Sequence, residues 1–433
     1  MTFCKILLIG WAGDVLHSIE DWIRYGDELR RPLLVAPNLA DASKICIVGG
    51  GLSGLSIAYR IASKRPDVEI EILEKSKRCG GTIETWNQNG WLCDVAVNAA
   101  RPHPAFWRLV SDLELSNLFS GSNPKATTRW VISNNNKSKL SMLTAIKMGP
   151  FRLLRSIRSS RRGGTSVADL IPNSSIADAM TLGIVNNVAN QVDADFLVPA
   201  LTKFGNEPPL KRSRIKKRMN KTYPLFTPKK GSTASFEGGM QTLIDALVGH
   251  LEKQPNVNFH YGHDCDDPKT VAETRGVPLS AVVWCGPLTR KPDQFTDLDI
   301  YVAGYTVKAA SNVPLGYGTL IPDENIPMSG ILHESDVHQS PRAPSEHRLF
   351  RIMAPCNRGG DEKSIRASLK QHLCNEDPVL FQKIGRRKIP CYPPGYMAAL
   401  DSESVEWTRA GWFYSGVSVT HVVAEAERIA DLF

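Results

Sequence analysis

Three glycines have the types and spacing of a site that binds a dinucleotide. Gly49, Gly51 and Gly54 follow the apolar run 44–48, and a helical pattern, 55–63, begins directly after them. In such a turn the first glycine allows the tight bend, the second lets a pyrophosphate approach the backbone, and the third lets the helix pack closely on the sheet. The helix N-terminus points free N–H groups at the phosphates. The pattern predicts a bound phosphate-rich cofactor, and a surface strand-turn-helix without a ligand is the alternative.

An acidic residue and a second glycine pair indicate which cofactor this is. The second strand, expected over 68–73, ends at Glu74, where a carboxylate can bind a ribose hydroxyl and favours FAD or NAD over NADP. Gly80 and Gly81 follow, and adjacent glycines let a loop lie flat against a second phosphate or a flavin, which favours FAD. A plain glycine-rich hairpin turn is the alternative. The cofactor contacts predicted in this part are Gly49, Gly50, Gly51, Leu52, Ser53, Gly54, Glu74, Lys75, Arg78, Gly80, Gly81 and Thr82.

Composition excludes several classes of protein. The chain has 433 residues, of which 42% are hydrophobic and 22% charged, so disordered, collagen-like and coiled-coil proteins are excluded. No apolar run approaches 18 residues, so no transmembrane helix is expected. The nine cysteines form no CxxC pair, which argues against a disulfide scaffold and a zinc site and fits a reducing compartment. We therefore predict no bound metal.

The positive charge belongs to the middle of the chain. The net charge is +8, and the segment 137–221 alone holds 16 Lys and Arg against 5 Asp and Glu. Apolar residues alternate with arginines over 151–162, which predicts an amphipathic helix suited to an anionic membrane surface. The run 211–221 has seven basic residues without the interleaved aromatics of a nucleic-acid platform. We expect a membrane surface and no nucleic acid as partner, and a solvated loop is the alternative.

Further blocks along the chain resemble the flavin-containing amine oxidase-like superfamily and, within it, the protoporphyrinogen oxidases. Two of them point to that family in particular, the Gly-Tyr-Gly-x-Leu loop with Tyr317 and the Ile-Pro-x-Tyr block at 389–396. The blocks are, in chain order, Gly49–Gly54 with Glu74, Arg78-x-Gly80-Gly81, Gly90-Trp91-x-x-Asp94 with Asn98 and Arg101-Pro102, Phe236–Leu243, Gly316–Pro322, Gly330–Ser335, Ile389–Tyr396, and Ala410-Gly411 followed by Gly416–Val419.

The resemblance implies an activity and its residues. It implies FAD-dependent oxidation of protoporphyrinogen IX to protoporphyrin IX with molecular oxygen as acceptor, on the mitochondrial inner membrane without spanning it, as a possible homodimer. Arg129 would face a propionate of the tetrapyrrole, and Tyr317 and Leu320 would form apolar walls. We assign no catalytic acid or base, because the gain in conjugation favours the oxidation. The further cofactor contacts implied are Asn98, Cys265, Ala410, Gly416, Val417 and Val419.

Departures from the family pattern leave two other functions open. Ala96 and Val97 stand where the family has Gly-Pro beside the flavin, and His421 replaces an Asp at the start of the last helix. The alternatives are another flavin oxidase or desaturase of the same fold and a catalytically silent flavin- and membrane-binding homologue.

The pattern of elements predicts an α/β fold (mixed α+β). A Rossmann-like FAD-binding domain built from both chain ends would carry inserted substrate-binding and helical membrane-binding domains. The expected parts are an N-terminal extension on the surface (1–43), three parts of the FAD-binding domain (44–104, 226–285 and 401–433), a helical, basic membrane-binding domain (105–225) and a substrate-binding domain (286–400).

Overall fold

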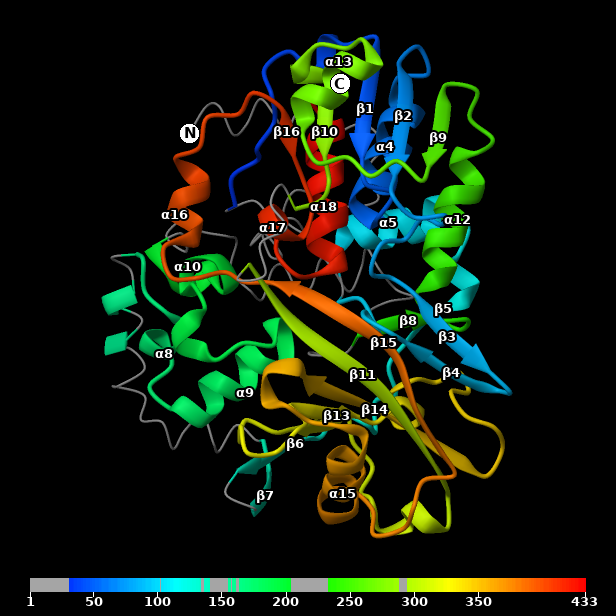
Figure 1. The fold of residues 1–433 in the computed structure, drawn as a ribbon, viewed down its shortest axis with the longest axis vertical. Helices are drawn as coiled ribbons and strands as arrows, with labels where there is room; N and C mark the ends of the chain where they lie inside the picture. The colour runs from blue at the N-terminus through cyan, green and yellow to red at the C-terminus, as the bar shows by residue number, and fades with distance from the viewer. Residues whose placement is uncertain are drawn as a thin grey trace.

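Two β-sheets organise the molecule, one in the upper and one in the lower half of Figure 1. A parallel sheet with helices on its faces confirms the predicted α/β class with a Rossmann-like domain. The computed structural model describes residues 31–101, 103–133, 136–140, 155–156, 158–160, 163–203, 233–287 and 294–433.

The upper sheet has five parallel strands in the order β16-β10-β1-β2-β9. Its central strand is buried from Ile45 to Val48, as expected of a parallel strand covered on both faces. Strands from the beginning, middle and end of the chain therefore lie side by side. They are β1 (Lys44–Val48), β2 (Glu69–Glu74), β9 (Val257–Tyr261), β10 (Val282–Trp284) and β16 (Thr408–Arg409).

Alternate residues of β1 face two different layers of helices. Ile45 and Ile47 belong to the large core formed with α4, α5, α12 and α18, whereas Cys46 and Val48 pack toward α13. The last helix, α18, packs along α4 and α5, which returns the chain's end to the first unit (Figure 1). The helices are α4 (Leu52–Lys64), α5 (Pro104–Asp112), α12 (Gln241–Leu251), α13 (Pro268–Arg275) and α18 (Val419–Ala430).

The lower sheet has seven strands in the order β15-β11-β14-β13-β12-β6-β7. All neighbours are antiparallel except β12 and β6, which pair in parallel with Gly318 opposite Arg129. One face packs against α15 (Glu362–His372) through Ile365 and Leu369. The strands are β6 (Arg129–Ser133), β7 (Asn136–Lys139), β11 (Phe295–Thr306), β12 (Gly318–Leu320), β13 (Gly330–Leu332), β14 (His347–Pro355) and β15 (Leu380–Pro390).

Short helices and two pairs of strands connect the sheets. The helices form a second core with the end of β15 on the left of Figure 1. They are α8 (Val167–Leu170), α9 (Ser174–Val185), α10 (Ala194–Leu197), α16 (Tyr396–Asp401) and α17 (Trp412–Ser415), with α14 (Glu334–Val337) beside β14. A hairpin joins β3 (Thr85–Gln88) and β4 (Trp91–Asp94), and a long-range antiparallel pair joins β5 (Phe119–Gly121) and β8 (Ala234–Phe236).

The described part of the N-terminal segment, 31–42, is not an extension on the surface. Leu34, Ala36 and Leu39 are each less than 5% exposed, and the backbone N–H of Arg409 donates to the Leu34 carbonyl. The expectation for this stretch is therefore wrong, because its apolar residues pack beside β16. The helix expected near residues 15–23 lies outside the described residues.

Several other expectations differ from the structure. The stretch 314–330 has the composition of loops, but its residues 318–320 form β12 near the middle of the seven-stranded sheet. Most of the amphipathic helix expected over 151–162 and all of the basic run 211–221 lie outside the described residues. Within the described ranges, no helix is both long and apolar enough to span a bilayer.

Candidate cofactor and substrate site

The glycine turn after β1 has the shape of a phosphate cradle. Gly49 has a φ of +106°, and a Cβ on Gly54 would lie 2.0 Å from the Gly49 carbonyl oxygen, so the helix approaches the strand as only glycine allows. Gly51 differs, because a Cβ there would meet no atom nearer than Gly81 Cα at 4.0 Å. Space is therefore open in front of Gly51, at the beginning of α4, with Leu52 and Ser53 in its first turn.

Glu74 ties the cradle to the next loop. Its carboxylate accepts hydrogen bonds from the backbone N–H groups of Gly50 at 2.7 Å and Ser76 at 2.8 Å. The N–H of Gly80 donates to the Gly50 carbonyl at 2.8 Å, which brings the second glycine pair against the first. Gly80 and Gly81 have φ angles of +114° and +57°. The two predicted glycine motifs thus face each other.

Three other residues of this block lie at its edge. Arg78 donates to the carbonyls of Cys79 and Ile83 and pairs with Glu84 at 3.0 Å, so it supports the turn. Lys75 and Thr82 are exposed.

The C-terminal motif meets the cradle from the opposite side. The Ala410 N–H donates to the Trp284 carbonyl, and a Cβ on Gly411 would lie 3.6 Å from Ser53 Oγ. The Gly411 N–H donates to the buried carboxyl of Glu425 at 2.6 Å, and burial raises the pKa of that carboxyl to about 8. Cofactor-binding candidates from both chain ends are therefore brought together.

The first turn of α18 carries one departure from the family pattern. Gly416 has a φ of +92° and leads through Val417 to Val419, the first residue of α18. His421 Nδ1 lies 3.4 Å from an Nη atom of Arg31, and a Cβ on Gly416 would lie 3.2 Å from the same imidazole nitrogen. The buried Arg31 of the N-terminal segment thus lies beside the start of α18, where His421 replaces the aspartate of the family pattern.

The loop after β4 contains an unsatisfied polar group. Asn98 Nδ2 is buried and has no hydrogen-bond partner among the residues that the structure describes. Ala96 is 3% exposed, so its side chain fits inside the fold. An orphaned amide and the open space at Gly51 both fit a bound nucleotide cofactor.

Cys265 lies at the same edge of the parallel sheet. It follows β9, and the neighbouring His263 N–H donates to the Glu74 carbonyl at 3.0 Å. In doubly wound sheets ligands bind at the carboxyl ends of the strands, which is where the cradle, Glu74 and Cys265 are found.

The three predicted substrate residues lie on the seven-stranded sheet. Arg129 begins β6 and stacks on Tyr317, with its guanidinium carbon 4.2 Å from the ring centroid. Leu320 ends β12, and its Cδ2 lies 3.2 Å from the position of a Cβ on Gly183 in α9. The structure therefore brings Arg129 and Tyr317 together and places Leu320 against the short helices.

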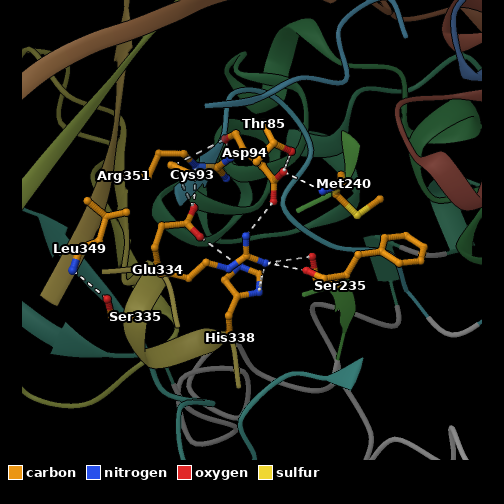
Figure 2. Close-up of polar contacts among 12 residues, drawn as sticks. Thr85, Cys93, Asp94, Ser235, Met240, Glu334, Ser335, His338, Leu349 and Arg351 are labelled. Carbon is orange, nitrogen blue, oxygen red and sulfur yellow. Dashed lines mark hydrogen bonds and ion pairs between the residues drawn. The ribbon is translucent and has the colours of Figure 1, made fainter. Parts of the chain in front are cut away.

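A buried ionic network, shown in Figure 2, lies beside these residues. Glu334 pairs with Arg351 at 3.2 Å and with His338 at 2.9 Å, and Arg342 lies 3.7 Å from Asp94. Burial alone would raise the pKa of the Glu334 carboxyl, but Arg351 and His338 lower it to about 2.

The network fixes the loop that leads to Asn98. The Asp94 carboxylate accepts from the Met240 N–H at 2.8 Å and from Thr85 Oγ1 at 2.7 Å, and its carbonyl accepts from Arg351 at 2.7 Å. The loop is thereby held from both the nucleotide-binding half and the seven-stranded sheet. Among the described residues, no three His, Cys, Asp or Glu side chains are grouped as a metal site.

Comparisons with known proteins identify one matching domain and several relatives of this chain. The model of an NAD(P)-binding Rossmann-like domain matches residues 47–113. Protoporphyrinogen oxidase 1 of Arabidopsis thaliana chloroplasts is 34% identical over 29% of this chain and 24% of its own length. Protoporphyrinogen oxidase 2 of the same plant is 22% identical over 90% of this chain and 93% of its own. The chain resembles the protoporphyrinogen oxidases.

Solved structures agree on the fold. An Exiguobacterium protein assigned as a protoporphyrinogen oxidase has a TM-score of 0.63 at 14% identity, covering 90% of this chain and 98% of its own. Putrescine oxidase has a TM-score of 0.56 at 13% identity, covering 89% and 98%. The matched part spans only 24% of the first plant relative and 10% of the Saccharomyces cerevisiae protoporphyrinogen oxidase, so activity and substrate are matters for proposal.

The glycine spacing located the cofactor motifs and the resemblance to the protoporphyrinogen oxidases added further blocks, but neither located the ionic network. Glu334 and Asp94 stand in recognised blocks, yet their partners Arg351 and His338 carry no local pattern.

Proposed function

We propose that the chain is an FAD-dependent oxidase that converts protoporphyrinogen IX to protoporphyrin IX, with oxygen as electron acceptor. The observation that supports it most is the Arg129–Tyr317 contact at the start of the adjacent strands β6 and β12, within a fold that has a dinucleotide cradle. An arginine held against an aromatic ring suits a flat substrate with a carboxylate at its edge.

The chain's own residues would bind, orient and enclose. The backbone of 49–54 would hold the pyrophosphate, with Glu74 toward a ribose hydroxyl and Asn98 Nδ2 donating to a cofactor acceptor. FAD, when bound, supplies the redox chemistry. Arg129 would fix one end of the substrate while Tyr317 and Leu320 border its faces, so that catalysis depends mainly on positioning.

Two measurements test this proposal. Purified chain is titrated with FAD, and binding is followed by the flavin absorbance near about 375 and 450 nm, as for the free cofactor. The loaded chain is then given protoporphyrinogen IX, and the fluorescence of the porphyrin product is recorded. Formation of product with consumption of oxygen supports the proposal. A chain that turns yellow but oxidises only an amine or a polyene would belong to a different oxidase class, and one that oxidises nothing would be a silent homologue.

Membrane attachment is a further part of this proposal. The basic segment 137–221 favours an anionic surface such as the mitochondrial inner membrane, to which a poorly soluble tetrapyrrole would partition. Sedimentation with vesicles of phosphatidylcholine plus cardiolipin, compared with phosphatidylcholine alone, tests it. Equal binding to both vesicles, or none, would remove the electrostatic argument, and imaging of the tagged chain would test the compartment.

A further inference from the structure

Arg387 on β15 faces the predicted cofactor loop. It pairs across the sheet with the buried Leu298, and its strand neighbour Gly385 lies against Val95, where a Cβ would come within 2.5 Å of Val95 Cγ1. One Nη atom of Arg387 donates to the Ala96 carbonyl at 3.2 Å. Arg387 therefore reaches from the seven-stranded sheet into the loop between Asp94 and Asn98.

The guanidinium also lies next to the C-terminal cofactor motif. Its central carbon is 5.8 Å from the ring centroid of Trp412, which directly follows Ala410 and Gly411. Arg387 thus lies between two segments with cofactor-binding candidates, the loop 94–98 and the C-terminal motif at 410–412.

Unlike the other arginines near this loop, Arg387 has no carboxylate. Arg351 pairs with Glu334 and Arg342 approaches Asp94, but among the residues that the structure describes Arg387 forms no ion pair. Its Nε atom is buried and lacks a hydrogen-bond partner there. Burial and the nearby positive charge of Arg351 lower the pKa of Arg387 to about 10.

A guanidinium without a counter-ion lowers the stability of the folded chain. Arg387 is half-buried, and a charge partly removed from water without a counter-ion destabilises the folded chain. One backbone carbonyl offsets only part of this penalty, because an uncharged acceptor does not neutralise the guanidinium. An anion from outside the chain, bound beside the guanidinium of Arg387, would supply the missing counter-charge.

We propose that Arg387 faces the isoalloxazine of bound FAD and stabilises the negative charge that the ring acquires on reduction. This rests on the proposed function. The substrate would give the ring two electrons and one proton and release a second proton to solvent, so the ring gains one negative charge. Oxygen would then take the two electrons together with the ring's proton and one proton from solvent, and leave as hydrogen peroxide. The negative charge on the ring beside Arg387 would appear on reduction and disappear on reoxidation in each turnover.

The anion that Arg387 meets is distinct from the one assigned to Arg129. In the sheet order, β15 and β6 are five strand spacings apart. At about 4.8 Å per spacing this is roughly 24 Å, so the two arginines serve different groups.

Sulfite provides a direct probe, because it adds reversibly to oxidised flavin and leaves a negative charge on the ring. We expect Arg387→Met, loaded with FAD, to bind sulfite at least about tenfold more weakly than wild type and to have a more negative flavin reduction potential. Arg387→Lys should restore most of the sulfite affinity. The matched control is Arg386→Met, because Arg386 is exposed on the other face of β15 and pairs with Asp299 at 2.6 Å. That variant should match wild type.

Each outcome decides the matter. A yellow Arg387→Met with wild-type sulfite affinity overturns the inference and leaves the proposed function standing. A wild-type chain that takes up no flavin ends both. If Arg387→Met takes up no FAD, the thermal unfolding of its apoprotein is compared with that of the Arg386→Met apoprotein. Equal stability then supports contact with the cofactor, and earlier unfolding shows that Arg387 serves the fold instead.

Discussion

Arg129 lies over the ring of Tyr317, with its guanidinium carbon 4.2 Å from the ring centroid. The two residues are 188 positions apart in sequence; Arg129 begins β6 and Tyr317 directly precedes β12, which pairs in parallel with β6. Stacking occupies the face of the guanidinium and leaves its in-plane N–H groups for a carboxylate. Among the described residues Arg129 forms no ion pair, so those donors are available to a ligand.

Replacing Arg129 should weaken substrate binding without touching the cofactor. We expect Arg129→Ala to raise the KM for protoporphyrinogen at least about tenfold, since a lost charge-assisted contact costs about 1.5–3 kcal/mol. Arg129→Lys should recover part of this, because an ammonium cannot donate the paired hydrogen bonds. The exposed Lys125→Ala serves as control for the loss of one positive charge. Loss of bound flavin in Arg129→Ala would mean that the residue belongs to the cofactor site.

Two glycines of the cradle should respond differently to the same substitution. Gly51→Ala places its methyl group in open space at a φ of −76°, so the stability of the apoprotein should change by less than about 0.5 kcal/mol. The methyl group would stand where the pyrophosphate approaches, and FAD affinity should fall at least about tenfold. Fluorescence titration with FAD and thermal unfolding of the apoprotein measure the two effects.

Gly54→Ala is the matched comparison. Its Cβ would overlap the Gly49 carbonyl oxygen at 2.0 Å, so the helix must move and the apoprotein itself should lose about 1–3 kcal/mol. If Gly51→Ala bound FAD as tightly as wild type, the open space at Gly51 would not be the phosphate site.

The cradle could be predicted from sequence, because all of its parts lie within one local unit. Gly49 to Gly81 form a strand, a turn, a helix and a second strand, and each glycine has a distinct steric role there. The structure adds that Glu74 accepts from the Gly50 N–H and that the Gly80 N–H donates to the Gly50 carbonyl, which closes the unit.

The contacts that hold the loop before Asn98 could not be predicted in this way. Arg351 donates to the Asp94 carbonyl from 257 positions away, and Arg387 reaches Ala96 from 291. Neither arginine lies in a periodic or glycine-rich pattern, so nothing local distinguishes them from the exposed Arg386. Only the order of strands in the seven-stranded sheet brings them to the loop. The burial of Arg31 escaped prediction for the same reason, since its contacts are with Phe196 and His421.

The buried carboxyl of Glu425 should make stability depend on pH. Burial raises its pKa from an ordinary 4.5 to about 8, and it faces the Gly411 N–H, Ser415, Arg428 and Arg31. Between pH 4.5 and 8 the folded chain therefore holds a proton that the unfolded chain has lost. The free energy of unfolding should fall as pH rises through this window, by at most about 1.4 kcal/mol per pH unit from this group.

Glu425→Gln should remove that part of the slope while an amide oxygen still accepts from Gly411. Urea unfolding of the apoprotein at pH 5, 6, 7 and 8 measures it, with the exposed Glu406→Gln as control. An unchanged slope in Glu425→Gln would show that the carboxyl is ionised in the folded chain.

The pairing of Glu334 with Arg351 should couple the stability of the two sheets' junction to the position of the cofactor loop. Arg351→Met alone leaves the buried carboxylate with His338 and the Cys93 thiol, and Glu334→Gln alone leaves Arg351 without its carboxylate, so each should cost about 3–5 kcal/mol. The double variant removes both charges and should cost less than the sum, with a coupling of about 0.5–3 kcal/mol in urea unfolding.

Because Arg351 also holds the Asp94 carbonyl, the double variant should still bind FAD more weakly than Glu334→Gln. If the costs were additive, the ion pair would contribute nothing beyond its two separate side chains. If FAD affinity were equal in the double and the single variant, Arg351 would not position the loop.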